Sequence, residues 1–351
     1  MDRFTHSSIT KVELGYLQEI GDEGQNSKVW KAKDIGADRI VAVKKVPKSD
    51  FRDVLTYYQE ARMLNRARHP NVAELTFAGE DGDDIVVVMP FYERGSLSGL
   101  MHTRFLTVRE IAKYGLGILS GLHHIHSHGI IHCDIKPTNV MLGPDGRPMM
   151  TDFGHSHLMN NQGVAEFKHL YQHNWAPEQL AANVVTVSSD IYQTGLTLYR
   201  MCNGDSFFKE SRIRAISTGT FKSMMNEGKW PDRSRFLAHI PNRLKRTIRR
   251  ALAPNPDDRY ASALEMANDL ALIDECLDWK YSSSGTTHSW AHDTVSVIAR
   301  PDGSGKWSVV TTKQRAGKSI RVSAGCRDDI ESLAGKGSKQ MADLLGEMPP
   351  R

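Results

Sequence analysis

The sequence of 351 residues predicts an α+β protein with two lobes, followed by a small β-rich α+β domain. Residues 13–46 alternate like strands and are rich in β-branched side chains, and two more strands are expected within residues 75–89. Residues 97–279 follow a mostly helical spacing. Alternation returns in residues 294–312 around Asp-Gly-Ser-Gly at 302–305, which is a hairpin signal.

The first lobe is expected over residues 13–89, after an N-terminal extension of residues 1–12. Its most strand-like segment is Ile-Val-Ala-Val-Lys-Lys-Val at residues 40–46. Apolar side chains at helical spacing predict one main helix within residues 54–64. The last two strands are joined by a turn at residues 81–83, Asp-Gly-Asp.

The helical lobe is expected over residues 90–279, and an accessory domain of unknown role over residues 280–351. Residues 281–287, Tyr-Ser-Ser-Ser-Gly-Thr-Thr, have the composition of a linker. Residues 319–323 are a candidate third strand of this domain. A helix is a candidate over residues 328–346, weakened by two glycines.

Composition and charge narrow the class of protein. Charged residues make up 25% and hydrophobic residues 40% of the chain, as in ordinary soluble domains. The net charge of +4 is small and does not favour nucleic acid as a partner. The longest apolar run, residues 85–89, is too short for a membrane span, and residues 1–6 carry no secretory signal. The four cysteines are far apart, which favours reduced thiols in a cytoplasmic protein over disulfides or a zinc site.

The most informative segment is His-Cys-Asp-Ile-Lys-Pro-Thr-Asn at residues 132–139, followed by Asp-Phe-Gly at 152–154. The two segments supply two carboxylates, a lysine and an amide. Phosphoryl transfer from a magnesium nucleotide needs these groups: one carboxylate takes the acceptor's proton, the other holds the metal with the amide, and the lysine neutralises charge on the moving phosphoryl.

These segments resemble the catalytic loop H-R-D-x-x-x-x-N and the D-F-G turn of protein kinases, with Cys133 in place of the arginine. The resemblance implies that Asp134 takes the acceptor proton and that Lys136 stabilises the transferring phosphoryl. It implies that Asn139 and Asp152 hold Mg²⁺, with Mn²⁺ as an alternative. Each residue alone is also compatible with a simple turn or loop, but the joint spacing makes coincidence improbable.

The resemblance extends to the glycine-rich loop that covers the phosphates of ATP. Residues 20–29 keep Gly24 of the pattern G-x-G-x-x-G-x-V, with Gly21 next to its first position and Val29 at its end. Glycine allows the backbone N–H groups to approach an anion. Taken alone, the segment is equally compatible with an ordinary hairpin.

Val-Ala-Val-Lys at residues 41–44 resembles the V-A-I-K strand of kinases, whose lysine contacts the nucleotide phosphates and pairs with a glutamate. Lys44 is thus expected to bind ATP, with Glu60 as its partner. Both could instead be surface charges. A lysine centred in an apolar strand, ahead of a helix that carries a glutamate, disfavours that interpretation.

Residues 89–97 resemble the connection between the two kinase lobes. The adenine base is expected to donate to the Pro90 carbonyl and to accept from the Tyr92 N–H, because proline lacks only a donor. Met89 is expected to control access to the deep part of the pocket. The side chains that sandwich the purine would be Val29, Ala42 and Met141, although each is also compatible with plain core.

Three later residues distinguish a protein kinase from a small-molecule kinase. Glu178 lies in an A-P-E sequence, Asp190 resembles the aspartate that begins the central helix of the second lobe, and Arg259 resembles a late arginine that pairs with the A-P-E glutamate. A buried pair of Glu178 and Arg259 would brace the platform for a protein substrate. The resemblance spans residues 13 to about 279.

The chain is thus identified as a member of the Hanks-type serine/threonine protein kinases, with a C-terminal accessory domain. This resemblance implies a bilobal fold with a five-stranded first lobe and one main helix, ATP as cosubstrate and a protein substrate. A pseudokinase that only binds partners, and a small-molecule phosphotransferase, are the rival interpretations. The retained Lys44, Asp134 and Asp152 oppose the first rival, and the A-P-E glutamate opposes the second.

The chain departs from the family where kinases are often switched on. Cys133 replaces the arginine that receives a phosphate of the activation segment, and that segment, residues 154–176, contains Ser156 and Tyr171 but no threonine. We expect a kinase that needs no phosphate there. Regulation is then expected through residues 280–351, as a protein-binding or autoregulatory domain; a double-stranded-RNA module fits the strand and helix order poorly.

Two further patterns are open. Histidines gather at residues 123–132 and 155–173 and could sense pH or bind a metal, against the ordinary interpretation of singly hydrogen-bonded side chains. Residues 243–250 predict an amphipathic helix with a solvated basic face, including Lys245, which could dock an acidic partner.

Overall fold

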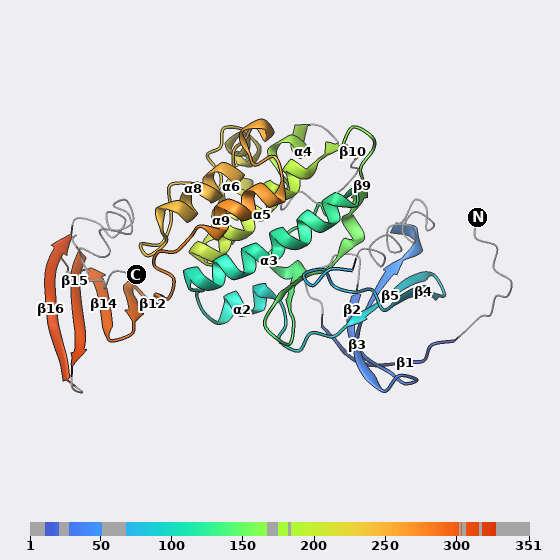
Figure 1. Ribbon diagram of the computed structural model, residues 1–351, viewed down its shortest axis with the longest axis horizontal. Helices are drawn as coiled ribbons and strands as arrows, with labels where there is room; N and C mark the ends of the chain where they lie inside the picture. The colour runs from blue at the N-terminus through green and yellow to red at the C-terminus, as the bar shows by residue number, and fades with distance from the viewer. Residues whose placement is uncertain are drawn as a thin grey trace. The chain divides into compact units, whose positions relative to one another are not determined.

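The computed structural model describes residues 11–20, 28–50, 68–166, 175–181, 184–301, 303, 307–315 and 318–327. The chain divides into two compact units, residues 1–93 and 94–351. They contain a five-stranded sheet, a mainly helical region and a second five-stranded sheet, which confirms the predicted fold class (Figure 1). The helices expected over 54–64 and 328–346 lie outside the described residues, as do Gly21, Gly24 and Glu60.

The first unit holds an antiparallel sheet with the order β1-β2-β3-β5-β4. Its strands are β1 (Leu14–Glu19), β2 (Lys28–Asp34), β3 (Arg39–Pro47), β4 (Phe77–Asp81) and β5 (Asp84–Pro90), with a short 3₁₀ turn η1 at Lys48–Asp50. One face packs a core of small and β-branched side chains, namely Ala32, Val41, Val43, Val86 and Val88. Within β3 and β5 the core residues are two positions apart, Val41 with Val43 and Val86 with Val88, as strand alternation requires.

The second unit is built around the helix α5 (Val187–Asn203), all of whose residues from Ser189 onward are buried. Its other helices are α2 (Leu97–Thr103), α3 (Val108–Ser127), α4 (Pro177–Ala181), α6 (Asp205–Ser217), α7 (Phe221–Asn226), α8 (Asn242–Ala251) and α9 (Ala263–Ala271). A capping box of Thr107 and Glu110 begins α3, and Thr186 with Ser189 begins α5. At Gly115, an added Cβ would lie 2.6 Å from Leu270 and 2.8 Å from Leu198, so glycine permits the close approach of α3 to its neighbours.

Short strand pairs shape the loops of this unit. They are β6 (Ile130–Ile131) with β9 (His157–Leu158), β7 (Val140–Leu142) with β8 (Pro148–Met150), and β10 (Ala165–Glu166) with β11 (Val184–Val185). Single 3₁₀ turns lie at η2 (Pro137–Asn139), η3 (Phe153–His155) and η4 (Pro256–Asp258). These pairs fix the ends of the segments that carry the candidate catalytic residues.

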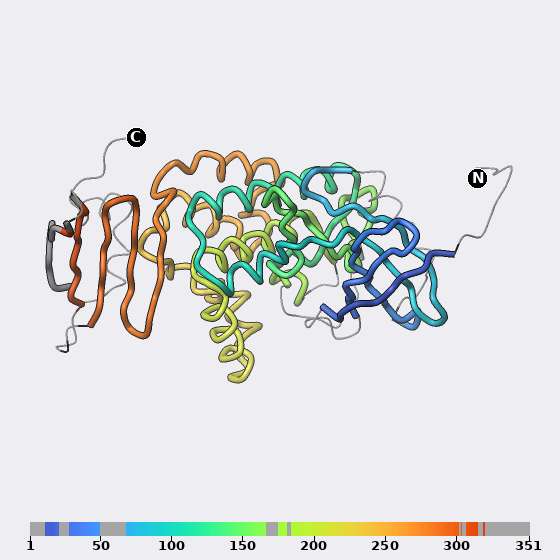
Figure 2. The backbone as a smooth tube through the Cα atoms, turned by 90° about the horizontal axis from the view of Figure 1, so that it is seen from below, coloured from blue at the N-terminus to red at the C-terminus, as the bar shows by residue number. Residues whose placement is uncertain are grey.

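The second sheet is an antiparallel meander whose strands run in chain order (Figure 2). Its strands are β12 (Lys280–Ser284), β13 (Thr287–His292), β14 (Val295–Pro301), β15 (Trp307–Arg315) and β16 (Lys318–Arg327). The strands expected around residues 302–305 are confirmed, and β16 contains the candidate strand at 319–323.

The expected linker at residues 281–287 is wrong, because this segment forms the hairpin of β12 and β13. Tyr281 and Trp290 face each other across the hairpin, and both are buried. Ser282, Ser283 and Ser284, which follow Tyr281 in β12, are exposed. Serine and glycine content therefore masked an alternating strand.

The β12–β13 hairpin is attached to the helical part of the same unit through aromatic side chains. Trp290 Nε1 donates a hydrogen bond to His239 Nδ1 at 3.2 Å, and the rings of Tyr281 and Phe105 lie 4.6 Å apart. Complete burial lowers the pKa of His239 to about 3, so its ring is neutral. Arg109 adds an exposed ion pair with Asp278 at 2.6 Å.

The prediction of a fully solvated basic face on α8 is wrong at Lys245, whose exposed fraction is only 3%. Burial, and secondarily Arg249, lowers its pKa. Arg250 pairs with Glu265 at 2.6 Å and lies over the Tyr260 ring. Several of these basic side chains therefore make contacts inside the unit, which disfavours the hypothesis that they dock an acidic partner.

Among the described residues, we find no helix with the length and hydropathy needed to cross a membrane.

Candidate active site

The carboxylate of Asp134 is held by two neighbours in the loop that follows β6. Lys136 Nζ lies 2.8 Å from Asp134 Oδ2, and Asn139 Nδ2 donates to the same oxygen at 2.8 Å. Asn139 Nδ2 also donates to the Asp134 carbonyl oxygen at 2.9 Å. The structure thus brings together three of the residues that the sequence assigns to phosphoryl transfer.

The loop is anchored to α5 by Asp190, whose exposed fraction is 0%. Asp190 Oδ2 accepts from the backbone N–H of His132, and Oδ1 accepts from that of Cys133, both at 2.8 Å. His126 Nε2 lies 2.8 Å from Asp190 Oδ2. These bonds hold Cys133 at a φ of 67°, a left-handed conformation that is unfavourable for a residue with a Cβ.

Gln193, one helical turn after Asp190, is a loop anchor that the sequence did not reveal. Its Nε2 donates to the Cys133 carbonyl at 2.7 Å, and its Oε1 accepts from the Ile135 N–H at 2.8 Å. Thr197 lies one turn further along and donates to the Ile135 carbonyl at 3.4 Å. A polar stripe at spacings of three and four on a buried helix was the available signal.

The β7–β8 hairpin brings the two candidate metal ligands close together. Val140 pairs with Met150, and the Thr151 N–H donates to the Asn139 carbonyl at 2.9 Å, so Asn139 lies opposite the residue before Asp152. The amide nitrogen of Asn139 is bonded to Asp134, which directs the amide oxygen away from that carboxylate. An amide oxygen and a carboxylate are ligands that suit a hard divalent cation.

No cluster of three or more His, Cys, Asp or Glu side chains that could enclose a metal occurs in the described parts of the chain. A divalent cation at Asn139 and Asp152 would therefore take its remaining ligands from nucleotide oxygens and water, as Mg²⁺ commonly does. The histidine-rich segments likewise form no metal cluster within those parts.

His132 packs behind the catalytic loop as a neutral ring. It is fully buried, its ring lies 4.7 Å from that of Phe153, and its Nδ1 accepts from the Asp134 N–H at 3.4 Å. Burial lowers the pKa of His132 despite the nearby carboxylates. A neutral imidazole can accept this hydrogen bond, whereas an imidazolium cannot.

In the first unit, four of the residues expected to bind ATP share one face of the sheet. Val29 is the cross-strand partner of Lys44, and Ala42 is the partner of Met89. Because cross-strand partners and alternate residues point to the same side, these four lie opposite the core described above. Because side chains along a strand alternate between the two faces of the sheet, the core lies on one face and Lys44 lies on the other.

For three further residues expected to contact ATP, the structure gives the position in the chain's elements. Pro90 ends β5, and Tyr92 is half-buried beside it, with burial raising its pKa to about 12. Met141 lies in β7 of the second unit, opposite Met149.

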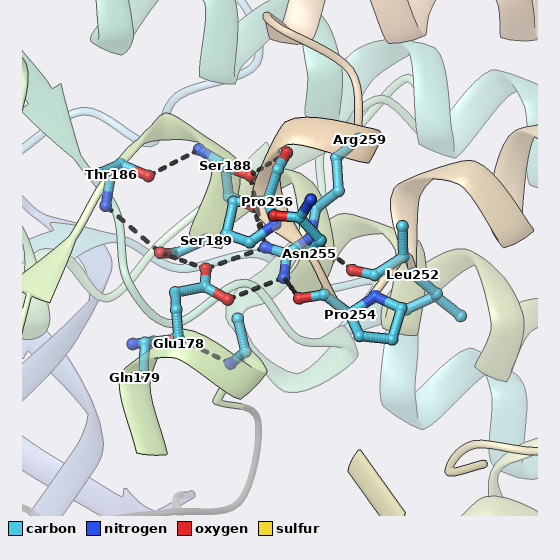
Figure 3. Close-up of polar contacts among 12 residues, drawn as sticks. Glu178, Gln179, Thr186, Ser188, Ser189, Leu252, Pro254, Asn255, Pro256 and Arg259 are labelled. Carbon is cyan, nitrogen blue, oxygen red and sulfur yellow. Dashed lines mark hydrogen bonds and ion pairs between the residues drawn. The ribbon is translucent and has the colours of Figure 1, made fainter. Parts of the chain in front are cut away.

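Glu178 and Arg259 form the ion pair expected from the sequence (Figure 3). Arg259 Nη2 lies 2.7 Å from Glu178 Oε2, and Nη1 lies 2.9 Å from Oε1. Arg259 also donates to three backbone carbonyls, those of Ala253, Ser188 and Pro254. Ser189 Oγ donates to Glu178 Oε1 at 3.0 Å, which links α4 to the start of α5.

Cys133 lies in an apolar cluster rather than in a site for an anion. The cluster joins it to Ile131, Ala165 and Val185, with Met159 and Trp175 packed against them. Ser156 has an exposed fraction of 2%, and Tyr171 lies outside the described residues. The cluster packs the catalytic loop against the β10–β11 pair.

Comparison with known proteins agrees with this geometry. A probable serine/threonine-protein kinase PknB of Lactococcus lactis is 28% identical over 263 residues, which cover 73% of this chain and 41% of the relative. A probable serine/threonine-protein kinase of Streptomyces coelicolor is 31% identical, with 76% of this chain and 40% of the relative covered. Serine/threonine-protein kinase PrkC of Bacillus subtilis is 28% identical, with 72% of this chain and 39% of the relative covered.

The matched region is thus well under half of each of these relatives. The family model for the protein kinase domain matches residues 15–271, which include both units' candidate site residues. The chain therefore belongs to the protein kinase domain family.

Proposed function

We propose that this protein transfers the γ-phosphoryl group of ATP to serine or threonine hydroxyls of a protein substrate. The observation that carries the proposal is the carboxylate of Asp134, held at one oxygen by both Lys136 and Asn139. A fixed carboxylate beside a lysine is what orienting a hydroxyl and receiving its proton require. The relatives described above are named serine/threonine-protein kinases, which favours hydroxyls of serine and threonine as acceptors.

Asp134 acts on the acceptor in this proposal. Its carboxylate accepts a hydrogen bond from the substrate hydroxyl and takes the proton as the new phosphate ester forms. Lys136, 2.8 Å from Asp134 Oδ2, supplies positive charge where negative charge collects on the transferring group. Neutral His132 supports the loop without adding a charge of its own.

Asn139 and Asp152 would hold Mg²⁺, with Mn²⁺ as the alternative. When bound, the ion neutralises phosphate charge. The purine of ATP would lie against the side chains of Val29, Ala42, Met89 and Met141. Its edge would form hydrogen bonds with the backbone of Pro90 and Tyr92. The phosphates would be approached by Gly21, Gly24 and Lys44, with Glu60 as the partner of Lys44.

We also propose that activity does not depend on phosphorylation of residues 154–176. The apolar cluster around Cys133 supports this, because Ala165 and Val185 hold the segment by packing where a phosphate would need a cation. The burial of Ser156 supports it as well, since a kinase cannot reach a side chain with an exposed fraction of 2%.

A regulatory role is proposed for residues 280–351. The attachment of β12–β13 to the helical part through Trp290 and Tyr281 supports it. A partner that binds this sheet would act on a structure continuous with the catalytic unit, whereas a flexible tether would isolate it.

The test is incubation of the full chain with γ-labelled ATP and Mg²⁺, with and without an added protein, beside Asp152→Ala. The control is Asp145→Ala, which removes an exposed carboxylate from the turn of the same β7–β8 hairpin. Label on phosphoserine or phosphothreonine with wild type and the control, but not with Asp152→Ala, supports the proposal. If no protein is labelled by wild type, itself included, the kinase function is wrong and a pseudokinase or small-molecule phosphotransferase is favoured.

A further inference from the structure

The two backbone groups that Gln193 binds flank the candidate catalytic residue on either side. Its side-chain amide donates to the carbonyl of Cys133 at 2.7 Å and accepts from the N–H of Ile135 at 2.8 Å. Gln193 has an exposed fraction of 0% and lies on α5, a helix that is buried along most of its length. An amide with both ends bonded has little freedom to rotate.

These bonds act on a strained part of the backbone. Cys133 adopts a φ of 67°, and such a conformation persists only where its surroundings hold it. Asp190 bonds the N–H groups of His132 and Cys133, which fixes the loop before the strained residue. Gln193 fixes the carbonyl after it and the N–H beyond Asp134, so the peptide groups on both sides of Asp134 are tied to α5.

We propose that Gln193 is a positioning residue for phosphoryl transfer, which holds Asp134 in its working orientation from the side of α5. This inference rests on the proposed function and deepens it. The side chain of Cys133 makes apolar contacts, so the loop draws its order from helix α5 and from packing. Gln193 thus supplies, inside the folded unit, the restraint that a phosphate on the activation segment would otherwise provide.

The first variant is Gln193→Met, which has similar length and volume but neither donates nor accepts these hydrogen bonds. Displacement of a catalytic group by about 1 Å can cost about 100-fold in rate, so we expect kcat to fall about 10- to 100-fold. KM for ATP should change less than about two-fold, because the nucleotide contacts assigned above are not altered.

The matched control is Thr194→Val on the same buried helix. Thr194 also has an exposed fraction of 0%, but its hydroxyl donates to the Asp190 carbonyl inside α5 and makes no bond to the loop. The control reports the cost of altering the helix itself. Its kcat should stay near that of wild type, whatever small loss of stability it shows.

The second variant, Gln193→Glu, gives a readout that a purely structural role would not produce. A protonated carboxyl can donate to the Cys133 carbonyl and accept from the Ile135 N–H, as the amide does, whereas a carboxylate repels that carbonyl. Burial raises the pKa of such a carboxyl. The kcat of Gln193→Glu relative to wild type should therefore rise as pH falls from about 8 to about 6, and the ratio for Gln193→Met should stay flat.

Amide hydrogen exchange of residues 131–139 separates this inference from the proposed function, since it needs no turnover. Faster exchange of the Ile135 amide in Gln193→Met than in Thr194→Val, together with the loss of kcat, supports the inference. Wild-type kcat in Gln193→Met overturns it while the kinase function stands. Inactive wild-type protein contradicts the kinase function itself and removes the catalytic part of the inference, whatever the exchange data show.

Discussion

Arg259 binds Glu178 at two points, and the two side chains differ in how much other support they have. The guanidinium has an exposed side-chain fraction of 0% and donates to three carbonyls besides the carboxylate. The carboxylate is 19% exposed and accepts from Ser189. Arg259 is therefore the centre of this network, and Glu178 lies at its edge.

We predict that Arg259→Met destabilises the protein more than Glu178→Gln. Loss of the arginine leaves buried carbonyls and a carboxylate without their partner, which costs about 3–5 kcal/mol for such pairs. The Glu178→Gln variant keeps a hydrogen-bond acceptor for a guanidinium that retains its carbonyl partners, and should cost about 1–2 kcal/mol. Urea unfolding of both variants measures the difference. Equal losses would contradict this description of the network.

The cluster around Cys133 predicts that the arginine typical of the family is not tolerated here. Cys133→Arg places a long cation among Ile131, Ala165 and Val185. Overpacking alone costs about 1–3 kcal/mol, and an unpaired buried charge adds to it. We expect a lower Tm and reduced kinase activity, with Cys133→Ala close to wild type in both. A stable Cys133→Arg variant that gains activity when its segment is phosphorylated would argue against the packing account.

The C-terminal sheet is attached to the helical part by an aromatic contact and by an ion pair, and the two can be tested separately. Trp290 is buried and bonded to His239, whereas the Arg109–Asp278 pair is mostly exposed. Trp290→Ala should lower the free energy of unfolding by about 3–5 kcal/mol. Arg109→Ala should lower it far less, because an ion pair between exposed side chains contributes little to stability. Thermal and urea unfolding of the full chain measure both, and comparable losses would show that the aromatic contact is not what holds the hairpin.

His239 predicts a dependence of stability on pH. Its pKa is about 3 in the folded protein and 6.5 as a model value, so between these values the unfolded chain binds a proton that the folded chain does not. The contribution of neutral His239 to the free energy of unfolding is therefore fully present above pH 6.5 and is lost as pH falls toward 3. Near pH 5 the loss should be about 2 kcal/mol, since each pH unit is worth about 1.4 kcal/mol.

His239→Asn removes this titration and keeps an oxygen that can accept from Trp290 Nε1. Urea unfolding at pH 7.5, 6 and 5 should show a shallower decline for the variant than for wild type. Among the described residues, His132, His157 and His288 also have lowered pKa values, but they are present in both proteins and cancel in the comparison. Parallel declines would mean that His239 is not the group that titrates.

The sequence predicted those features that depend on local spacing. The strands β3 and β5 follow from β-branched alternation, and Asp134, Lys136 and Asn139 belong to one short segment whose spacing fixes their roles by resemblance. The Glu178–Arg259 pair was also accessible, because both residues lie in motifs whose partners are defined together.

Features that depend on distant contacts could not be predicted in this way. The hairpin of β12 and β13 is stabilised by Trp290 against His239, a contact that Ser- and Gly-rich composition does not show. Lys245 is buried because of what packs on α8, and helical periodicity alone placed it in solvent. The role of Gln193 requires knowing which loop lies against α5.

The most direct test of the central claim is the initial rate of γ-phosphoryl transfer by enzyme whose residues 154–176 carry no phosphate by mass spectrometry. The wild-type chain should phosphorylate serine or threonine of an added protein in this state. Asp134→Asn should reduce the rate by about 10²- to 10⁴-fold, the usual contribution of a general base. Phosphate-free enzyme that is inactive until Ser156 or Tyr171 is phosphorylated, or an Asp134→Asn variant as fast as wild type, would contradict the account.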